Sequence, residues 1–235
     1  MAIALPRPAE KAVLVRRMFD RIAPRYQRLN TVLTLGLDRG WRRAAIAAAQ
    51  LEPGDVVVDV ACGTGDLAAL AAAAGARAVG VDFAPAMLAR ARGRGASLVR
   101  GDAALLPLRS GCARAVTCGF ALRNVVEIGA VLAEAARVLR PGGHLVLLEI
   151  ASPRAPLLRW LHGLYFRRIV PVLGAILADR AAYAYLPASA AYLPSESALR
   201  GVLEDAGFTA VERRLLGAGS VQLVTARAEP AAEVV

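Results

Sequence analysis

A chain of 235 residues in which 57% are hydrophobic can bury one large core, so we expect a folded domain and exclude a disordered protein. The formal net charge is +10, but residues 1–50 hold seven of the excess positive charges and residues 51–150 hold only one. Because a nucleic-acid binder would carry its positive charge along a strand-binding groove, we expect no nucleic-acid partner and assign the charge to two segments, 1–50 and 151–180.

The cysteines and the apolar runs further restrict the class of protein and its location in the cell. Cys62, Cys112 and Cys118 share no metal-ligand spacing, so we expect no metal site and three small hydrophobic side chains in a cytoplasmic protein. The first residues lack the apolar core of a secretory signal. The apolar run at residues 169–178 is too short to span a bilayer, which needs about 20 such residues, but it suffices to lie on one.

Residues 10–50 are predicted to form an N-terminal helical segment. Apolar side chains recur at helical spacing from Val15 to Leu29, and arginines stand between them. Pro24 fits the first turn of a helix but not its interior, so it should divide this stretch into two helices.

Short apolar runs then alternate with helical patterns, which is typical of an α/β fold with a parallel sheet and helices on both faces. The tail adds a helix with Ser195 as its N-cap and two strands joined through residues 217–220. We therefore expect one domain over residues 1–235, interrupted by a helical insertion at 154–193. Strands are expected at residues 56–61, 77–82, 98–102, 114–120 and 144–150.

The first of these strands ends in the turn CGTGD, residues 62–66. In open α/β sheets ligands bind beyond the carboxyl ends of the strands, and Gly63 and Gly65 let a ligand approach the backbone because a Cβ would fill its space. A dinucleotide site would show a third glycine. The acids Asp59 and Asp66 would repel a pyrophosphate but suit the cationic amino group and sulfonium of S-adenosylmethionine.

Side chains at the ends of the next two strands fit the same cofactor. Asp82 lies about 20 residues beyond the glycines, where an acid can accept both ribose hydroxyls. Asp102 and the backbone of Ala103 are placed to bond the adenine. Phe83 and Met87 would supply apolar contact to the base.

Taken together, the segments "MFDRIAPRYQRLNTVLTLGLDRGWRR", "VVVDVACGTGDL", "GVDFAPAML", "GDAALLP", "FALRNV", "EAARVLRPGGHLVLLEI" and "YLPASAAYLPS" resemble the ubiquinone/menaquinone biosynthesis C-methyltransferases over residues 16–226. The resemblance implies a class I S-adenosylmethionine-dependent methyltransferase with a Rossmann-like sheet of seven strands, the last antiparallel. It also implies methylation of a ring carbon of a polyprenylated quinol. Gln27 stands where the family usually has Asp, which leaves any acidic role at this position open. The implied cofactor contacts are Thr64, Asp82, Asp102, Ala103 and Gly119.

Carbon methylation of a quinol needs removal of a phenolic proton and in-line alignment of the ring carbon with the sulfonium methyl. Arg123, just beyond the predicted fourth strand, is the first candidate to stabilise the phenolate, and Asn124 is placed to orient an oxygen. Tyr26 and Glu149 are further candidates for handling the proton. As alternatives, Arg123 and Asn124 would cap the next helix or pair with Glu127, and Tyr26 and Trp41 would be core side chains.

The two histidines are not assigned to catalysis. His144 opens a strand at the edge of the sheet away from the ligands, so we expect it at the surface. His162 is interpreted as a packed core or interface side chain rather than a base.

The insertion at residues 154–193 has two interpretations. It either completes the core as an ordinary helical insertion or forms a lid over the substrate, with an apolar inner side for an isoprenoid tail. Arg159, Arg167 and Arg168 stand near aromatic residues, a combination that suits contact with anionic lipid headgroups. We favour the lid, and with it a protein at the inner face of the cell membrane.

The function predicted from the sequence is S-adenosylmethionine-dependent C-methylation of a polyprenylated quinol, with demethylmenaquinol preferred over a ubiquinone-pathway benzoquinol. A small-molecule phenol methyltransferase of secondary metabolism is the nearest alternative, because the same fold serves many acceptors. A non-catalytic protein that binds the cofactor is the non-enzymatic alternative. An adenine-type RNA methyltransferase would carry an N/D-P-P-Y/F motif where "GFALRN" stands. The other expected partners are an anionic membrane and a second copy of the chain, as a homodimer.

Overall fold

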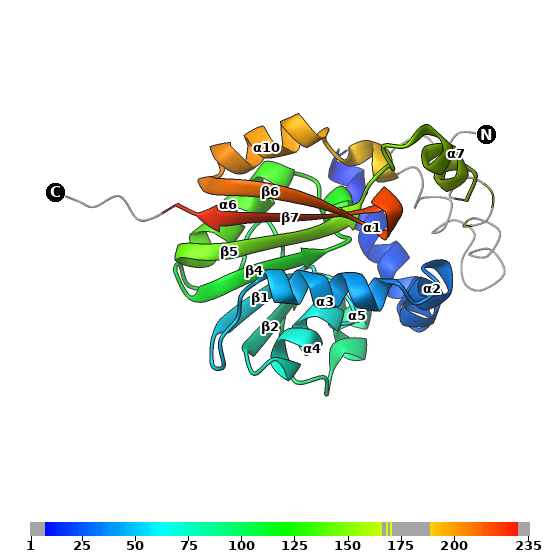
Figure 1. The fold of residues 1–235 in the computed structure, drawn as a ribbon. Coiled ribbons are helices and arrows are strands. Elements are labelled where there is room, and N and C mark those ends of the chain that lie inside the picture. The colour runs from blue at the N-terminus through cyan, green and yellow to red at the C-terminus, as the bar shows by residue number, and fades with distance from the viewer. Residues whose placement is uncertain (1–7, 166–167, 169, 171–188, 230–235) are drawn as a thin grey trace.

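The computed structural model describes residues 8–165, 168, 170 and 189–229, and this part of the chain forms one seven-stranded sheet between helices (Figure 1). The strands are β1 (Val56–Val60), β2 (Arg77–Asp82), β3 (Ser97–Arg100), β4 (Ala113–Gly119), β5 (Leu139–Ile150), β6 (Phe208–Leu216) and β7 (Val221–Ala228). They lie in the order β3-β2-β1-β4-β5-β7-β6. β7 runs antiparallel to both neighbours, while β1 to β5 are parallel. The predicted Rossmann-like sheet is confirmed.

Helices from along the chain cover the two faces of the sheet: α3 (Asp38–Ala48), α4 (Asp66–Ala73), α5 (Pro85–Ala91), α6 (Ile128–Val138) and α10 (Glu196–Asp205). In β5, Leu145 and Leu147 are buried with side chains of α6 and α10, whereas Val146 and Leu148 are buried with α3 and α4. Successive residues of a strand point to opposite faces, so an almost wholly apolar strand needs cover on both.

The N-terminal segment breaks where the proline predicts. Helix α1 (Pro8–Ile22) ends before Pro24, and α2 (Tyr26–Leu33) begins after it. Val15 of α1 packs in a buried cluster with Met87 of α5. The N-terminal helices thereby reach the carboxyl end of β2, where α5 begins.

The predicted lid lies partly outside the described residues, as does Arg167. Its described helix is α7 (Pro156–Leu164), none of whose side chains is buried, and the 3-10 turn η3 (Ala190–Tyr192) follows closer to α10. In Figure 1, α1, α2 and α7 gather at the end of the sheet where the parallel strands finish. In the part of the chain that the structure describes, no helix is both long and apolar enough to cross a membrane.

The C-terminal region forms the predicted helix and two strands. Ser195 Oγ accepts a hydrogen bond from the backbone N–H of Ala198 at 3.2 Å and caps α10.

His144 was expected at the surface and is only 4% exposed. It lies on β5 opposite Arg227 of β7, and Arg227 Nη1 lies 3.0 Å from His144 Nε2.

Candidate functional site

Two cavities lie at the carboxyl ends of the parallel strands. The inner cavity, of about 230 Å³, is bordered by the ends of β1, β2 and β4 and by α1. The outer cavity, of about 430 Å³, lies between the α2–α3 turn, α7 and the turn η4 (Gly217–Gly219) that joins β6 to β7. Together they place two ligand-sized spaces where ligands bind in open α/β sheets.

The inner cavity is built on the glycine turn after β1. Gly63 has φ of +56°, and a Cβ added to it would meet nothing within 4 Å, so the missing side chain leaves open space at the ligand. Its N–H donates to Asp82 Oδ2 at 2.7 Å, and Asp82 Oδ1 accepts from the backbone N–H of Ala84 at 2.8 Å. These bonds fix the Asp82 carboxylate at the end of β2. Burial raises the pKa of Asp82.

The remaining lining suits an adenosine. The Met87 side chain is 1% exposed and lines the cavity with Phe83, which gives the apolar surface that a base needs. Asp102 is exposed at the rim, and its Oδ1 accepts from the N–H of Ala104 at 2.9 Å. The predicted cofactor residues that line this cavity are Gly63, Asp82, Phe83, Met87, Asp102, Ala103 and Gly119. These residues fit S-adenosylmethionine: a side-chain-free turn, one held carboxylate, an apolar surface and a second acid at the rim.

Three residues predicted to bind the cofactor do not line the cavity. Asp59 is 2% exposed, accepts from Thr117 Oγ1 at 2.8 Å and from the N–H of Ala68 at 3.1 Å, and so ties β1 to β4 and α4. Burial raises its pKa to about 7. A Cβ on Gly65 would lie 3.0 Å from the Cβ of Ala91, so this glycine allows α5 to approach. Thr64 is buried.

Asp66, the acid at the end of the glycine turn, also forms its contacts with side chains outside the inner cavity. Its carboxylate pairs with Arg94 at 2.7 Å and Arg42 at 3.6 Å and accepts from Gln27 Nε2 at 2.8 Å. Burial alone would raise the pKa of Asp66, but these arginines lower it. Asp66 therefore offers no uncompensated charge to a cationic cofactor. Gln27, the departure from the family pattern, is one of its partners.

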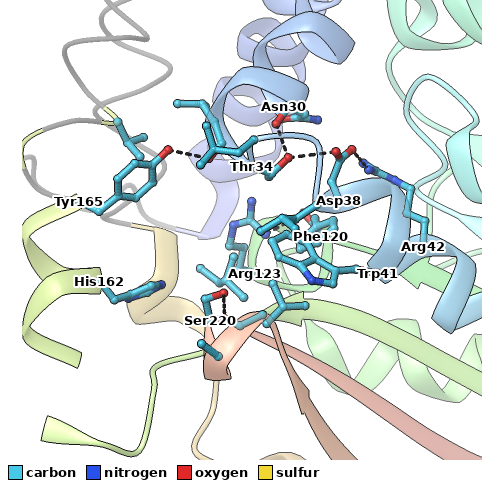
Figure 2. Close-up of a pocket in the computed structure, with 18 of the residues that line it drawn as sticks. Asn30, Thr34, Asp38, Trp41, Arg42, Phe120, Arg123, His162, Tyr165 and Ser220 are labelled. Atoms are coloured by element: carbon cyan, nitrogen blue, oxygen red, sulfur yellow. Dashed lines mark hydrogen bonds and ion pairs between the residues drawn. The ribbon is translucent and has the colours of Figure 1, made fainter. Parts of the chain in front are cut away.

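The outer cavity is mostly apolar, and Figure 2 shows Trp41, Phe120, His162 and Tyr165 around it. The Tyr165 hydroxyl donates to the carbonyl of Leu33 at 2.6 Å and joins the segment after α7 to α2. His162 lines this cavity, and burial lowers its pKa.

A shared wall separates the two cavities. Phe19, Tyr26, Phe120 and Asn124 line both, so an inner ligand and an outer ligand would contact the same four side chains. Tyr26 packs edge-on against Phe19, with ring centroids 6.0 Å apart. This wall is the place where a group could pass from one ligand to the other.

Arg123 lies beside this wall on the 3-10 turn η1 (Leu122–Asn124) and lines the outer cavity. It is 5% exposed, and its Nη1 pairs with Glu149 Oε1 and donates to the carbonyl of Phe120 at 2.8 Å. Its Nε donates to Ser189 Oγ at 3.2 Å. The side chain thus neither caps a helix nor pairs with Glu127. Asn124 Nδ2 donates to the same Phe120 carbonyl at 3.4 Å.

Several residues that line the outer cavity were not predicted from the sequence, or were predicted in another role. Trp41 was expected in the core, and Phe120 and Asp38 were given no role, yet all three line the outer cavity. The segment "TLGLDRGW" carries the relevant signal, because a turn rich in glycine and leucine between two amphipathic helices places apolar and acidic side chains together.

The sequence matches the ubiE/COQ5 methyltransferase family over residues 8–227. It is 44% identical to the demethylmenaquinone methyltransferase of Roseiflexus castenholzii, over 94% of this chain and 96% of the relative. It is 41% identical to the ubiquinone/menaquinone biosynthesis C-methyltransferase UbiE of Syntrophotalea carbinolica, over 88% and 91%. The fold resembles that of a SAM-dependent methyltransferase from Thermotoga maritima, with a TM-score of 0.64 at 19% identity over 91% of this chain and 99% of that one.

Proposed function

This chain belongs to the ubiE/COQ5 methyltransferase family, and from that premise we propose that it methylates a ring carbon of a polyprenylated quinol, with demethylmenaquinol as acceptor. It is a methyltransferase, and S-adenosylmethionine is its methyl donor. The wall shared by the two cavities carries the proposal, because it lets a donor site and an acceptor site meet. The names of the relatives at 44% and 43% identity support the naphthoquinol.

The outer cavity suits the acceptor chemistry. S-adenosylmethionine supplies an electrophilic methyl group when it is bound. An apolar, water-poor cavity favours the reaction because phenolate and sulfonium neutralise each other as the methyl moves. We place the ring at the shared wall, where Asn124 would orient one of its oxygens and Tyr26 would handle its proton.

Arg123 is the residue that we assign to the phenolate. Glu149 largely cancels its charge, so its contribution would come from directed N–H groups rather than from net charge. Glu149, Phe120 and Ser189 use the Nε and Nη1 hydrogens, and no described residue accepts those of Nη2. Because Arg123 lines the outer cavity, these are the donors that we assign to a phenolate oxygen.

An acceptor panel tests the proposal. Purified protein with S-adenosylmethionine would be given a naphthoquinol, the matching methoxy-benzoquinol and a simple phenol in detergent, and methylated products would be quantified by mass spectrometry. We expect the highest kcat/KM for the naphthoquinol. Product from the benzoquinol or the phenol alone would replace the acceptor by that class, and cofactor binding without any product would identify a non-catalytic protein.

We further propose that the site opens onto an anionic membrane, from which the acceptor comes. Apolar side chains are exposed beside the outer cavity: Leu35, which lines it, at 86%, and Leu157 and Trp160 at 68% and 60% on α7, whose Leu158 and Leu161 line it. The side chain of Arg154, beside α7, is 75% exposed, and Arg168 is exposed after it. Apolar side chains flanked by arginines suit insertion among anionic headgroups. Under this proposal the protein, as one domain over residues 1–235, works at the inner face of the membrane.

Vesicle binding tests this placement with a matched control. Trp160→Glu should weaken sedimentation with phosphatidylglycerol vesicles at low salt by about tenfold, because the tryptophan would no longer insert. Leu105→Glu changes a leucine that is 76% exposed but follows β3 and does not line the outer cavity, so it should bind like the wild type. Equal loss in both variants, or in neither, would contradict the membrane face. The homodimer stays a prediction that sedimentation velocity can check.

A further inference from the structure

One corner of the outer cavity is polar, in contrast to the rest of its lining. The polar corner consists of Asn30, Thr34, Asp38 and Arg42, which come from α2, from the α2–α3 turn and from α3 (Figure 2). Asp38 is 6% exposed and Arg42 is 7% exposed. Charged side chains at this depth need partners, and those partners decide what the corner can bind.

The Asp38 carboxylate accepts fewer hydrogens from the described residues than its two oxygens can hold. Thr34 Oγ1 lies 2.7 Å from the carbonyl oxygen of Asn30 and 2.9 Å from Asp38 Oδ1. A hydroxyl carries one hydrogen, and the Asn30 carbonyl already accepts the backbone N–H of Thr34 at 2.9 Å, so Asp38 Oδ1 is the acceptor that depends on the hydroxyl. Arg42 pairs with the other carboxylate oxygen, Asp38 Oδ2, and turns its Nη2 toward Asp66 at 3.6 Å. Asp38, which lines the cavity, therefore keeps acceptor lone pairs for a ligand.

The corner adjoins the shared wall. The guanidinium of Arg42 lies over the Phe120 ring, 5.6 Å from its centroid, and the Trp41 ring lies 6.4 Å from the same ring. Phe120 is one of the side chains that line both cavities. An aromatic acceptor packed on Phe120 and Trp41 thus has the polar corner within reach of a ring substituent.

We infer that the polar corner accepts the hydrogen of an acceptor hydroxyl and thereby selects the reduced quinol over the oxidised quinone. A quinol carries O–H donors, whereas a quinone offers only carbonyl oxygens, whose lone pairs would face Asp38 Oδ1 without a hydrogen between them. Only the reduced ring is nucleophilic at carbon, so the selection admits the reactive form. The inference rests on the proposed function, because it concerns the acceptor of that reaction.

Two substitutions should shift the selectivity in opposite directions. Asp38→Asn can turn an amide N–H into the cavity and donate to a quinone, so the preference for the quinol should fall. Thr34→Val removes the hydroxyl of the corner, which could otherwise rotate toward a quinone, so the preference should rise. Thr31→Val makes the same change on α2 outside the cavity lining and should leave the preference unchanged.

The measurement is calorimetric titration under argon with a short-tailed 2-isoprenyl-1,4-naphthoquinone and its quinol, with S-adenosylhomocysteine present to prevent turnover. We expect the wild type to bind the quinol about tenfold more tightly than the quinone, and Asp38→Asn to bring this ratio near one. If Asp38→Asn does not fold, the rise expected for Thr34→Val still tests the inference.

The outcomes separate this inference from the proposed function. A merely structural role for Asp38 and Thr34, holding the α2–α3 turn, would lower stability but leave the quinol-to-quinone ratio as it is, and that result would overturn the inference. A wild type that methylates the naphthoquinol yet binds both redox forms equally would overturn the inference alone. A wild type that binds neither form would overturn both.

Discussion

Arg123 and Glu149 form a buried pair whose stability and catalytic roles can be measured separately. Their side chains are 6% and 3% exposed, so removing either one leaves an uncompensated charge inside the protein. Arg123→Met should therefore cost about 3–5 kcal/mol of unfolding free energy. Adding Glu149→Gln removes the second charge, and it keeps an acceptor for the backbone N–H of Ile150, which donates to Glu149 at 2.8 Å. The double variant should recover most of the lost stability.

Catalysis should not recover with stability. Loss of the Nη2 donors should lower kcat by about 10²-fold in both Arg123→Met and the double variant, the size typical of a removed oxyanion donor. Glu149→Gln alone keeps the arginine and should be destabilised while retaining most turnover. Urea unfolding gives the free energies, and methyl transfer is measured below the unfolding transition of all variants. If the double variant regains turnover together with stability, Arg123 has only a structural role.

Three further predictions follow from the inner cavity and the buried histidine. Gly63→Ala should weaken cofactor binding in equilibrium dialysis because its Cβ enters the open space, whereas Gly65→Ala should mainly lower stability because its Cβ meets Ala91 at 3.0 Å; equal effects on binding would contradict this division. Asp82→Asn has one acceptor oxygen for two backbone N–H groups and should weaken cofactor binding about tenfold, and an unchanged Kd would remove the assignment. Burial, followed by the nearby arginines, lowers the pKa of His144 to about 4, below its unfolded value, so stability is complete above about pH 6.5 and falls as the pH drops toward 4. Urea unfolding should show His144→Gln losing less than the wild type between pH 7 and pH 5, by about 2 kcal/mol, and equal losses would exclude His144 as a source of acid sensitivity.

The sheet was predictable because its signals are local. The strands from Val56 to Ile150 are nearly continuous apolar runs, and the glycine turn after β1 marks the ligand end in a few residues. Ser195 shows its cap within three residues of the chain. Such features depend on neighbours in sequence, and the structure confirms the sheet and the cap.

The partners of the charged residues were not predictable, because they come from distant parts of the chain. Glu149 reaches Arg123 because β5 lies beside β4, and Asp66 meets Arg42 and Arg94 only after α3, α4 and the segment after α5 have packed. The pattern of the sequence offers Glu127 to Arg123 as a near neighbour, but the parallel sheet supplies a closer one. The outer cavity has the same origin, since its walls come from three separate segments.

In the proposed reaction a methyl group crosses the shared wall to a ring carbon. The most direct test is to incubate the protein with S-adenosylmethionine carrying a trideuterated methyl group and a reduced demethylmenaquinone, and to locate the label in the product by tandem mass spectrometry and NMR. We predict a trideuteromethyl group on the carbon beside the isoprenoid chain. A label on a phenolic oxygen, or no transfer from a bound cofactor, would contradict methyl transfer to the ring carbon.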